Sequence, residues 1–487
     1  MTETQGVRFR EIDGRRSSQT AGRSAFAAAA AAVDPALAEE ISAESSWRKR
    51  YLGPVRRLVE AGARSRQATV DIARAGLERL QANVEFASPD GTAPLTEAVS
   101  RGDRVTLGTA VTNVTGATGP PTLQLPYRGE VLRGDGIRRQ LDAWVDGGII
   151  EASCREAVEK VLANPDWLDL SDKRFVILGA ASEMGAFEAL SAWGAHVFAV
   201  DLPEPRLWER ILRTAREGRG ALSMPVRGTA TSKDPAEIAG ADLLGETPAI
   251  AGWLAEVDPP FTIVDDTYAD GSRFLLLASA TDALMRDQAQ RQGVSLAYLA
   301  TPTDVFAVPE EVALAARTSR RRGRGPLRAL SGGSLYRPGY GELIKGEDGR
   351  RWGIVDCLVA QQGANYILAK TIQRWRAVST REDGTLVSAN VAPATRTRSV
   401  TKNKALAAAY RGAAPYGIEI FEPETSRWLM AALLVHDLRN DGEGAAPAGH
   451  PYDLHVQSAA HGGIWRLGYE PRSVLPLAVL RGFLRRP

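Results

Sequence analysis

Short apolar runs alternate with amphipathic segments through the second half of the chain. Residues 174–178 (RFVIL) and 195–202 (AHVFAVDL) are apolar runs of strand length, and a helix-like segment that ends at Gly194 lies between them. The same alternation continues through residues 261–308 and 352–393. Strands that alternate with helices pair in parallel, with helices on both faces of the sheet. The sequence therefore predicts an α/β fold built on a doubly wound parallel sheet.

The first half of the chain has a different pattern and divides into two segments. Residues 1–45 are polar at first and then alanine-rich, which we interpret as a mobile, low-complexity tail. Residues 46–169 carry apolar positions at helical spacing and a Thr- and Val-rich stretch at 104–127, which predict a mainly helical extension with some strand. The remaining residues, 170–487, are then expected to form the sheet domain, with insertions.

Composition and charge are typical of a soluble globular protein. The 487 residues are 44% hydrophobic and 24% charged, and the net charge of +2 gives no overall field that would attract nucleic acid or an anionic membrane. No apolar run approaches the roughly 20 residues that span a bilayer. Cys154 and Cys357 make no disulfide framework, which fits a reducing cytosol. We expect a cytoplasmic protein with no nucleic-acid partner and no membrane span, and leave homo-oligomer formation open.

A turn bounded by glycines, GAASEMG at 179–185, follows the first apolar run and precedes a helix. In dinucleotide-binding domains, such a turn brings backbone N–H groups to a pyrophosphate at the start of the helix, which accounts for Gly179 and Gly185. Asp201 ends the next strand about 20 residues later, where a carboxylate accepts hydrogen bonds from ribose hydroxyls. It would repel a 2′-phosphate, so NAD is favoured over NADP, although Arg206 leaves NADP open. We interpret the segment as part of a Rossmann-like domain; an ordinary tight corner is the alternative.

Tyr366 and Lys370 lie four positions apart in a predicted helix, so their side chains share one face. A lysine ammonium near a phenol favours the phenolate and lowers the pKa of the tyrosine. Such a tyrosine can act as a general acid or base on a carbonyl or alcohol oxygen. The alternative is a half-buried tyrosine with an incidental lysine neighbour.

With these motifs, the chain resembles the short-chain dehydrogenase/reductase superfamily from about Lys173 to about Leu438. LGAASEMG is similar to its cofactor turn, AVDL to its NAD-selecting strand end, YILAK to its catalytic Tyr-x-x-x-Lys, and NVAPATRT to its loop beside nicotinamide. The resemblance implies that Tyr366 transfers the proton, and that Lys370 binds the nicotinamide ribose and depresses the tyrosine pKa. It further implies an NAD(P)(H)-dependent oxidoreductase that interconverts a small carbonyl compound and a secondary alcohol. The cofactor-binding residues that it implies are Gly179, Ser182, Met184, Gly185, Asp201, Asp242, Pro393 and Thr397.

Departures from the family pattern keep other functions open. Glu183 stands in the turn where the family has a glycine. The stretch before the tyrosine, VDCLVAQQGAN, lacks the serine that polarises the substrate oxygen, and LATPTD occupies the place of the usual Asn-Asn-Ala-Gly. A degenerate, non-catalytic nucleotide-binding scaffold or interaction protein is therefore the alternative, and a lyase or epimerase with tightly held NAD is a third hypothesis. The polar residues that could replace the serine are Asp356, Gln361, Gln362 and Asn365.

Two further clusters carry weaker signals. His450, His455 and His461 lie close together in sequence, but their spacing is not typical of a compact zinc site, so we expect no metal and interpret His461 as structural. The basic run from Arg317 to Arg328 lacks interleaved aromatic residues and predicts a solvated loop.

Overall fold

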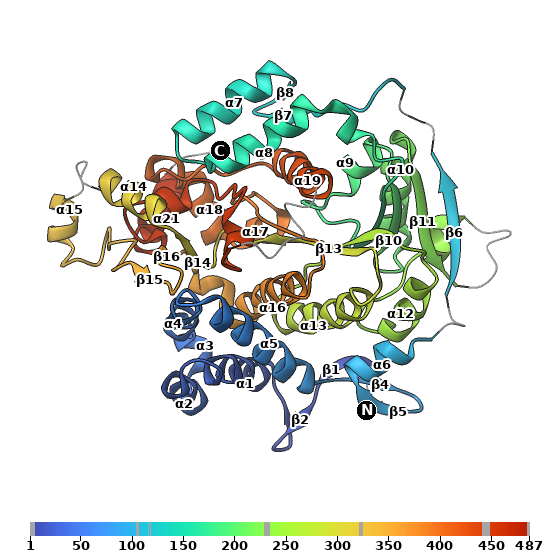
Figure 1. Ribbon diagram of the computed structural model, residues 1–487, viewed down its shortest axis with the longest axis horizontal. Helices are drawn as coiled ribbons and strands as arrows, with labels where there is room; N and C mark the ends of the chain where they lie inside the picture. The colour runs from blue at the N-terminus through green and yellow to red at the C-terminus, as the bar shows by residue number, and fades with distance from the viewer. Residues whose placement is uncertain are drawn as a thin grey trace.

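A seven-stranded, mostly parallel sheet forms the centre of the molecule (Figure 1). The computed structural model describes residues 5–103, 107–114, 116, 118–227, 234–320, 325–440 and 449–484. The six parallel strands are β9 (Arg174–Leu178), β10 (His196–Val200), β11 (Ala221–Val226), β12 (Phe261–Asp265), β13 (Val294–Ala300) and β17 (Val387–Val391). Their order is β17-β13-β12-β9-β10-β11, and β6 (Gly108–Asn113) pairs antiparallel with β11 at one edge. The predicted α/β class with a mostly parallel sheet is confirmed.

Both faces of this sheet are covered by helices. In β9, Val176 and Leu178 belong to the core on one face, whereas Phe175 and Ile177 belong to the core on the other. Successive strand residues point to opposite faces, so a strand buried on both sides reads as a continuous apolar run. The helices in the first core are α12 (Thr247–Ala255), α13 (Gly271–Gln288) and α16 (Gly363–Glu382); those in the second are α7 (Asp135–Asp146), α8 (Ala152–Ala163), α9 (Phe187–Ala192), α10 (Pro205–Glu217) and α19 (Pro423–Arg439).

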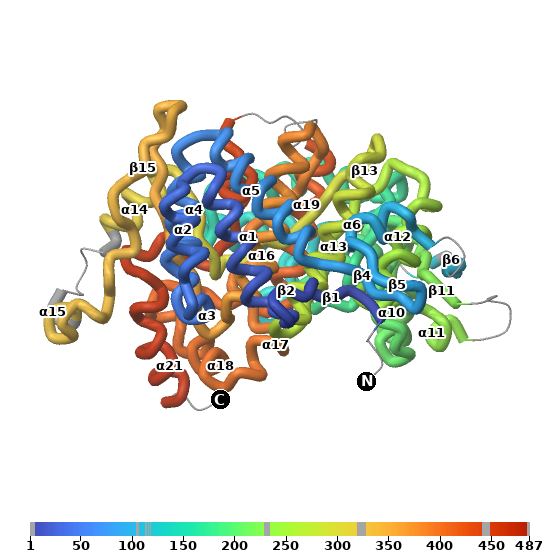
Figure 2. Tube along the Cα trace, turned by 90° about the horizontal axis from the view of Figure 1, so that it is seen from below, coloured from blue at the N-terminus to red at the C-terminus, as the bar shows by residue number. Residues whose placement is uncertain are grey.

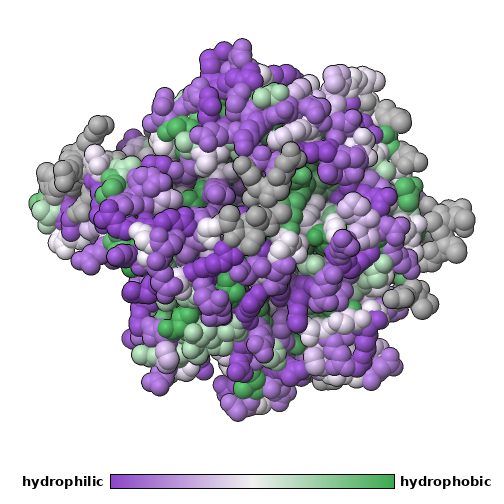
Figure 3. Space-filling view, in the orientation of Figure 1, coloured by the Kyte–Doolittle hydropathy of each residue, from purple (hydrophilic) through white to green (hydrophobic). Residues whose placement is uncertain are grey.

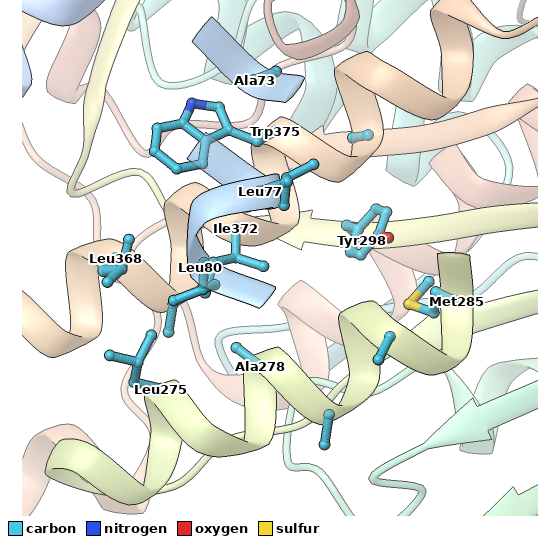
Figure 4. Close-up of a cluster of buried hydrophobic side chains, with 14 of the residues drawn as sticks. Ala73, Leu77, Leu80, Leu275, Ala278, Met285, Tyr298, Leu368, Ile372 and Trp375 are labelled. Atoms are coloured by element: carbon cyan, nitrogen blue, oxygen red, sulfur yellow. The ribbon is translucent and has the colours of Figure 1, made fainter. Parts of the chain in front are cut away.

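The N-terminal region adds a further layer outside α13 and α16 (Figures 1 and 2). Leu80 packs with Leu275 of α13 and Ile372 of α16 in the buried cluster of Figure 4. The helices approach closely at Gly76, where an added Cβ would lie 2.3 Å from the ring of Trp375. The elements of this layer are β1 (Gly6–Phe9), β2 (Glu11–Ile12), β3 (Arg15–Arg16), α1 (Ser18–Ala31), α2 (Pro35–Ala43), α3 (Trp47–Arg50), α4 (Leu52–Gly62), α5 (Arg66–Ala82), β4 (Val84–Ser88), β5 (Gly91–Pro94) and α6 (Leu95–Arg101).

The segment 5–45, within the predicted mobile tail, contains β1, α1 and α2. Phe26 of α1 and Leu37 of α2 are buried, and Ala25 and Ala29 have no exposed surface. The small alanine side chains let α1 pack against its neighbours through a narrow surface, which explains why an alanine-rich stretch contributes to a core here. Residues 1–4 of the predicted tail lie outside the described residues.

The segment between β13 and α16 forms a second, antiparallel sheet of β14 (Val305–Pro309), β16 (Arg351–Asp356) and β15 (Ile344–Lys345). The strand predicted at 352–360 therefore exists, but it lies outside the central sheet. The central strand that precedes α16 is β13, so the expectation that VDCLVAQQGAN closes the strand before Tyr366 is wrong. The helices of this segment are α14 (Glu310–Arg320) and α15 (Gly325–Leu330); of the basic run, residues 321–324 lie outside the described residues.

Besides α19, the chain after β17 forms short helices and a closely packed helix pair. Glycines let the two members of the pair touch: an added Cβ on Gly412 would lie 2.0 Å from the carbonyl oxygen of Ala478, and one on Gly482 would lie 1.7 Å from that of Ala408. The remaining short elements are β7 (Leu125–Tyr127), β8 (Glu130–Leu132), η1 (Pro165–Leu168), α11 (Pro235–Ile238), η2 (Ala360–Gln362), α17 (Arg398–Thr401), η3 (Ala414–Tyr416), α20 (Asp453–Val456), η4 (Ile464–Arg466) and η5 (Pro471–Ser473); the pair is α18 (Lys404–Gly412) and α21 (Leu475–Leu484).

The face drawn in Figure 3 is mainly hydrophilic, with small separate apolar areas. Within the described part of the chain, no helix combines the length and the apolar character needed to cross a membrane.

Candidate functional site

A cavity of about 600 Å³ opens at the carboxyl ends of the central strands. Residues directly after β9, β12, β13 and β17 line it, and so do side chains of α16 and α18. It brings together residues as far apart in sequence as Gly179 and Tyr410. The predicted site residues that line it are Gly179, Ser182, Met184, Asp201, Tyr366, Lys370, Pro393 and Thr397.

The glycine turn connects β9 to α9 along one side of this cavity. Gly179 has a φ of +83°, which favours glycine, and an added Cβ would lie 3.1 Å from backbone atoms of Asp266. An added Cβ on Gly185 would lie 2.8 Å from the Asp266 Oδ2 atom. Both glycines are therefore required by the chain's own neighbour, whether or not a ligand also approaches. Gly185 itself does not line the cavity.

Asp201 lies where the sequence predicts it, at the end of β10 and facing the turn. Its Oδ2 accepts a hydrogen bond from the Ala181 N–H at 2.8 Å, and its Oδ1 accepts one from the Leu202 N–H at 2.8 Å. Burial raises its pKa, while these two hydrogen bonds favour the charged form. Asp242 lies apart from the cavity lining, and its Oδ1 accepts from the Leu244 N–H at 3.0 Å, which stabilises the loop before α12.

Tyr366 is hydrogen-bonded to a residue that the sequence interpretation missed. Its hydroxyl lies 3.0 Å from the Oγ1 atom of Thr301, the first residue after β13, and the Thr301 and Thr303 hydroxyls are 3.0 Å apart. Counted along the chain, β12 is the fourth parallel strand and β13 is the fifth. LATPTD lies at the end of β13, whereas VDDTYAD (264–270) lies at the end of β12. The assignment of LATPTD to the place after the fourth strand is therefore wrong.

The polar residues considered above as substitutes for the serine of the short-chain dehydrogenase/reductase pattern lie in different places. Gln361 and Gln362 line the cavity. Asp356 instead pairs with Arg472, at 2.6 Å between Oδ2 and Nη2. The long segment of about 60 residues between Thr301 and Tyr366, with its basic and glycine-rich stretch, was the available signal that a strand and its helix had been separated by an insertion.

Lys370 lies one helical turn after Tyr366 and is held by a chain of buried polar groups. Its Nζ donates to the Gln373 Oε1 at 2.9 Å and to the Leu299 carbonyl at 3.3 Å. Gln373 Nε2 donates in turn to Asp265 Oδ2 at 2.9 Å, which fixes the orientation of the amide. Burial lowers the pKa of Lys370, and the nearby Asp265 opposes that shift.

The pKa of Tyr366 is raised, not lowered as expected from its lysine neighbour. Burial is the main cause, and the hydrogen bond that Tyr366 donates to Thr301 acts in the opposite direction. At neutral pH the phenol therefore keeps its proton.

Two carboxyl groups lie beside the turn where a dinucleotide site would hold phosphate. Asp266 Oδ2 accepts from the Ala186 N–H at 3.1 Å, and its buried Oδ1 has no hydrogen-bond partner among the described residues. Burial raises the pKa of Asp266 to about 7, so a substantial fraction is neutral near neutral pH. Glu183 accepts from the Arg398 backbone N–H at 2.7 Å and from its guanidinium, and so links the turn to the start of α17.

The three C-terminal histidines do not converge. His461 Nε2 lies 2.8 Å from Glu151 Oε1, and its Nδ1 accepts from the Gly463 N–H at 3.0 Å, so this ring has a structural role. His450 accepts from the Tyr452 N–H at 3.2 Å. Within the described ranges, no group of three or more His, Cys, Asp and Glu side chains is arranged to hold a metal ion.

Comparison with known proteins adds no relative: no protein-family model matches the chain, and no curated protein matches it significantly. The fold defines its class as an α/β protein with a mostly parallel, mixed sheet and a helical N-terminal region.

Proposed function

We propose that the protein is an NAD(P)(H)-dependent oxidoreductase that interconverts a carbonyl compound and a secondary alcohol. The observation that carries this proposal is the hydrogen-bonded pair of Tyr366 and Thr301, with Lys370 one turn further along α16, in the cavity that the glycine turn and Asp201 also line. The resemblance to short-chain dehydrogenases/reductases is improved by Thr301, which stands at the end of the strand where that family has its serine.

The arrangement of the sheet supports a dinucleotide site. Numbered along the chain, the parallel strands have the order 3-2-1-4-5-6, as in Rossmann domains, and the order reverses between β9 and β12. Ligands of such sheets bind at this switch point, outside the carboxyl ends of the strands. The cavity lies there.

The residues present fit NAD(H). Asp201 can accept hydrogen bonds from ribose hydroxyls. The N–H groups of residues 179–182 and 185 already donate within the protein, so a phosphate at this turn would take its donors from Glu183 and Met184. Asp266 fits a phosphate when its carboxyl is neutral and can donate a hydrogen bond from Oδ1, the atom that lacks a partner. NAD(H) would supply hydride exchange at nicotinamide C4.

The side chains then have distinct roles in carbonyl reduction. Thr301 and Tyr366 hold the substrate oxygen by hydrogen bonds, and the Tyr366 hydroxyl gives it the proton. The raised pKa of Tyr366 suits a proton donor. The Lys370 ammonium stabilises the phenolate that remains.

Titration with NADH and NADPH tests the cofactor site. We expect saturable NADH binding, and Asp201→Ala should weaken it about 10- to 100-fold, because a charge-assisted hydrogen bond contributes about 1.5–3 kcal/mol. Asp201→Asn keeps an acceptor for the Ala181 N–H but removes the charge, so it should narrow the preference for NADH over NADPH. Calorimetry measures each affinity.

Asp242→Ala is the matched control, because this aspartate lies in the loop before α12 and does not line the cavity; NADH affinity should stay within about twofold. Folded wild-type protein that binds neither nucleotide would refute the oxidoreductase proposal, and the glycine turn would then be a tight corner only.

Gln373 is expected to act as a positioning residue for Lys370. Gln373→Met removes the amide acceptor with little change of volume, so the Lys370 pKa should fall and the alkaline limb of the pH–rate profile should move down by about one unit, since one pKa unit is 1.36 kcal/mol. The measurement is kcat against pH.

Thr371→Val serves as the control, because Thr371 is buried in the same helix and its hydroxyl has no hydrogen-bond partner among the described residues. Its pH profile should match that of the wild type. An unshifted limb in Gln373→Met would exclude the positioning role.

A nucleotide-binding scaffold without catalysis is the second candidate, and Glu183 is the observation that favours it. Its carboxylate is hydrogen-bonded to Arg398. It stands at a position of the turn where close approach of a pyrophosphate would need a glycine. NADH binding without turnover of any ketone, in the series described below, would support this candidate.

A further inference from the structure

A smaller side cavity of about 90 Å³ lies beside the candidate site and shares part of its lining. Thr303 borders both cavities, and its hydroxyl contacts that of Thr301, the hydrogen-bond partner of Tyr366. The side cavity therefore lies next to the proposed position of the substrate oxygen. The residues that line both cavities are Thr303, Gln362, Ala394, Val400, Leu406 and Tyr410.

The walls of the side cavity are mainly apolar. Ala409 of α18, Ile420 and Val474 are typical of its lining. Arg472 is the one charged residue in the lining, and its guanidinium is occupied: Asp356 accepts from Nη2 at 2.6 Å and from Nη1 at 3.2 Å. The described lining thus holds no free charge that could pair with a charged ligand.

Close helix packing keeps this cavity open in one shape. α18 and α21 form two of its walls, and they meet through Gly412 and Gly482 with almost no space between their backbones. Such a pair cannot move together to fill the cavity, because the backbones are already in contact. The space is therefore preformed for a ligand group.

We infer that the substrate carries an uncharged, apolar chain or ring of about six to nine non-hydrogen atoms, and that this group occupies the side cavity between α18 and α21. The size follows from the volume, since one water-sized site takes roughly 10–15 Å³ on this measure. The inference rests on the proposed function for the reacting carbonyl, and it adds the substrate class.

Three methyl ketones test the inference: 2-butanone, 2-octanone, and 7-oxooctanoate, in which a carboxylate replaces the terminal methyl group of 2-octanone. Each buried methylene should raise kcat/KM with NADH about three- to fourfold, so 2-octanone should exceed 2-butanone about 100-fold. The carboxylate must lose its hydration in the apolar cavity, so 7-oxooctanoate should be at least about 100-fold poorer than 2-octanone. Saturation-transfer NMR measures binding of the same ketones without turnover.

Ala409→Phe fills the side cavity and should abolish the preference for 2-octanone while NADH still binds. Ala405→Phe, at an exposed position of the same helix, is the control and should behave as the wild type. If Ala409→Phe does not fold, Leu475→Ala on α21 replaces it: the enlarged cavity should shift the preference from 2-octanone towards 2-decanone.

The outcomes separate the inference from the proposed function. NADH-dependent turnover that is independent of chain length, or that is highest with 7-oxooctanoate, would overturn the substrate class and leave the oxidoreductase proposal standing. Binding of 2-octanone that Ala409→Phe abolishes, in a protein that binds no nucleotide, would retain the ligand class and refute the proposed function. A lack of 2-octanone binding would refute the inference in either case.

Discussion

Replacing Tyr366 by phenylalanine is expected to lower kcat/KM for ketone reduction about 10²- to 10⁴-fold while NADH affinity stays unchanged. The substitution removes only the hydroxyl that donates to Thr301 and leaves the ring packed against Phe274. General acid catalysis by one positioned group contributes a factor of this size. Steady-state kinetics with the best ketone of the series, combined with NADH titration, measures both quantities.

Tyr298→Phe is the matched control for this experiment. Tyr298 is a buried residue of β13, and its hydroxyl has no hydrogen-bond partner among the described residues. Its removal should change kcat/KM by less than about threefold. A Tyr366→Phe protein that retains wild-type turnover would exclude Tyr366 as the proton donor and leave Thr301 or solvent to supply the proton.

Removing the carboxylate of Glu151 is expected to destabilise the protein by about 3–5 kcal/mol at pH 7, because its loss leaves the partly buried Arg466 guanidinium and the buried His461 N–H without their acceptor. Glu151 is only 7% exposed and precedes α8. It accepts from His461 at 2.8 Å and from Arg466 at 2.9 Å and at a second guanidinium nitrogen. Urea unfolding of Glu151→Ala against wild type measures the loss.

The same group should give a distinct pH dependence. Burial alone would raise the pKa of Glu151, but the hydrogen bonds from His461 and Arg466 outweigh it and bring the pKa to about 2. Since the folded pKa lies below the unfolded one, the stabilisation is complete above about pH 4.5 and is lost as the pH falls towards 2. Glu151→Ala should lack this part of the acid transition.

Glu97→Ala is the control, because Glu97 pairs with Arg101 on an exposed helix surface. Such pairs contribute about 0–1 kcal/mol. If Glu151→Ala lost no more stability than Glu97→Ala, the buried cluster would have no structural role.

Strands β9, β10, β12, β13 and β17 could be predicted from the sequence because they are buried on both faces, whereas β11 and the place of β6 in this sheet were not predicted. RFVIL and AHVFAV have strand length and almost no polar position, and their turn and helix signals are local. The same local signals identified Tyr366 and Lys370, which share one helix, as well as Asp201 at a strand end. Tyr366, Lys370 and Asp201 all line the same cavity at the carboxyl ends of the strands.

Thr301 could not be recognised from local signals in the same way. Its hydrogen-bond partner, Tyr366, comes in the chain only after the whole second sheet of β14, β16 and β15. The apolar run of β16 is as strand-like as that of β13, and nothing local tells which of the two joins the central sheet. The raised pKa of Tyr366 was missed for a related reason: the helix spacing shows that Lys370 is near, but not how deeply both groups are buried. The alanine-rich α1 has little apolar surface per residue, so its burial depends on partners far away in sequence.

The pairing of β6 with β11 links the two halves of the chain in a way that matters for engineering it. Residues 108–113, from the N-terminal half, supply the outermost strand of a sheet whose other strands begin at residue 174. A fragment cut at the predicted boundary before residue 170 would leave the N–H and C=O groups of β11 that face β6 without their partners, as an open template for other chains. Residues 108–113 thus cover an edge that a shortened protein would expose, and such a protein should keep them attached or covalently tethered.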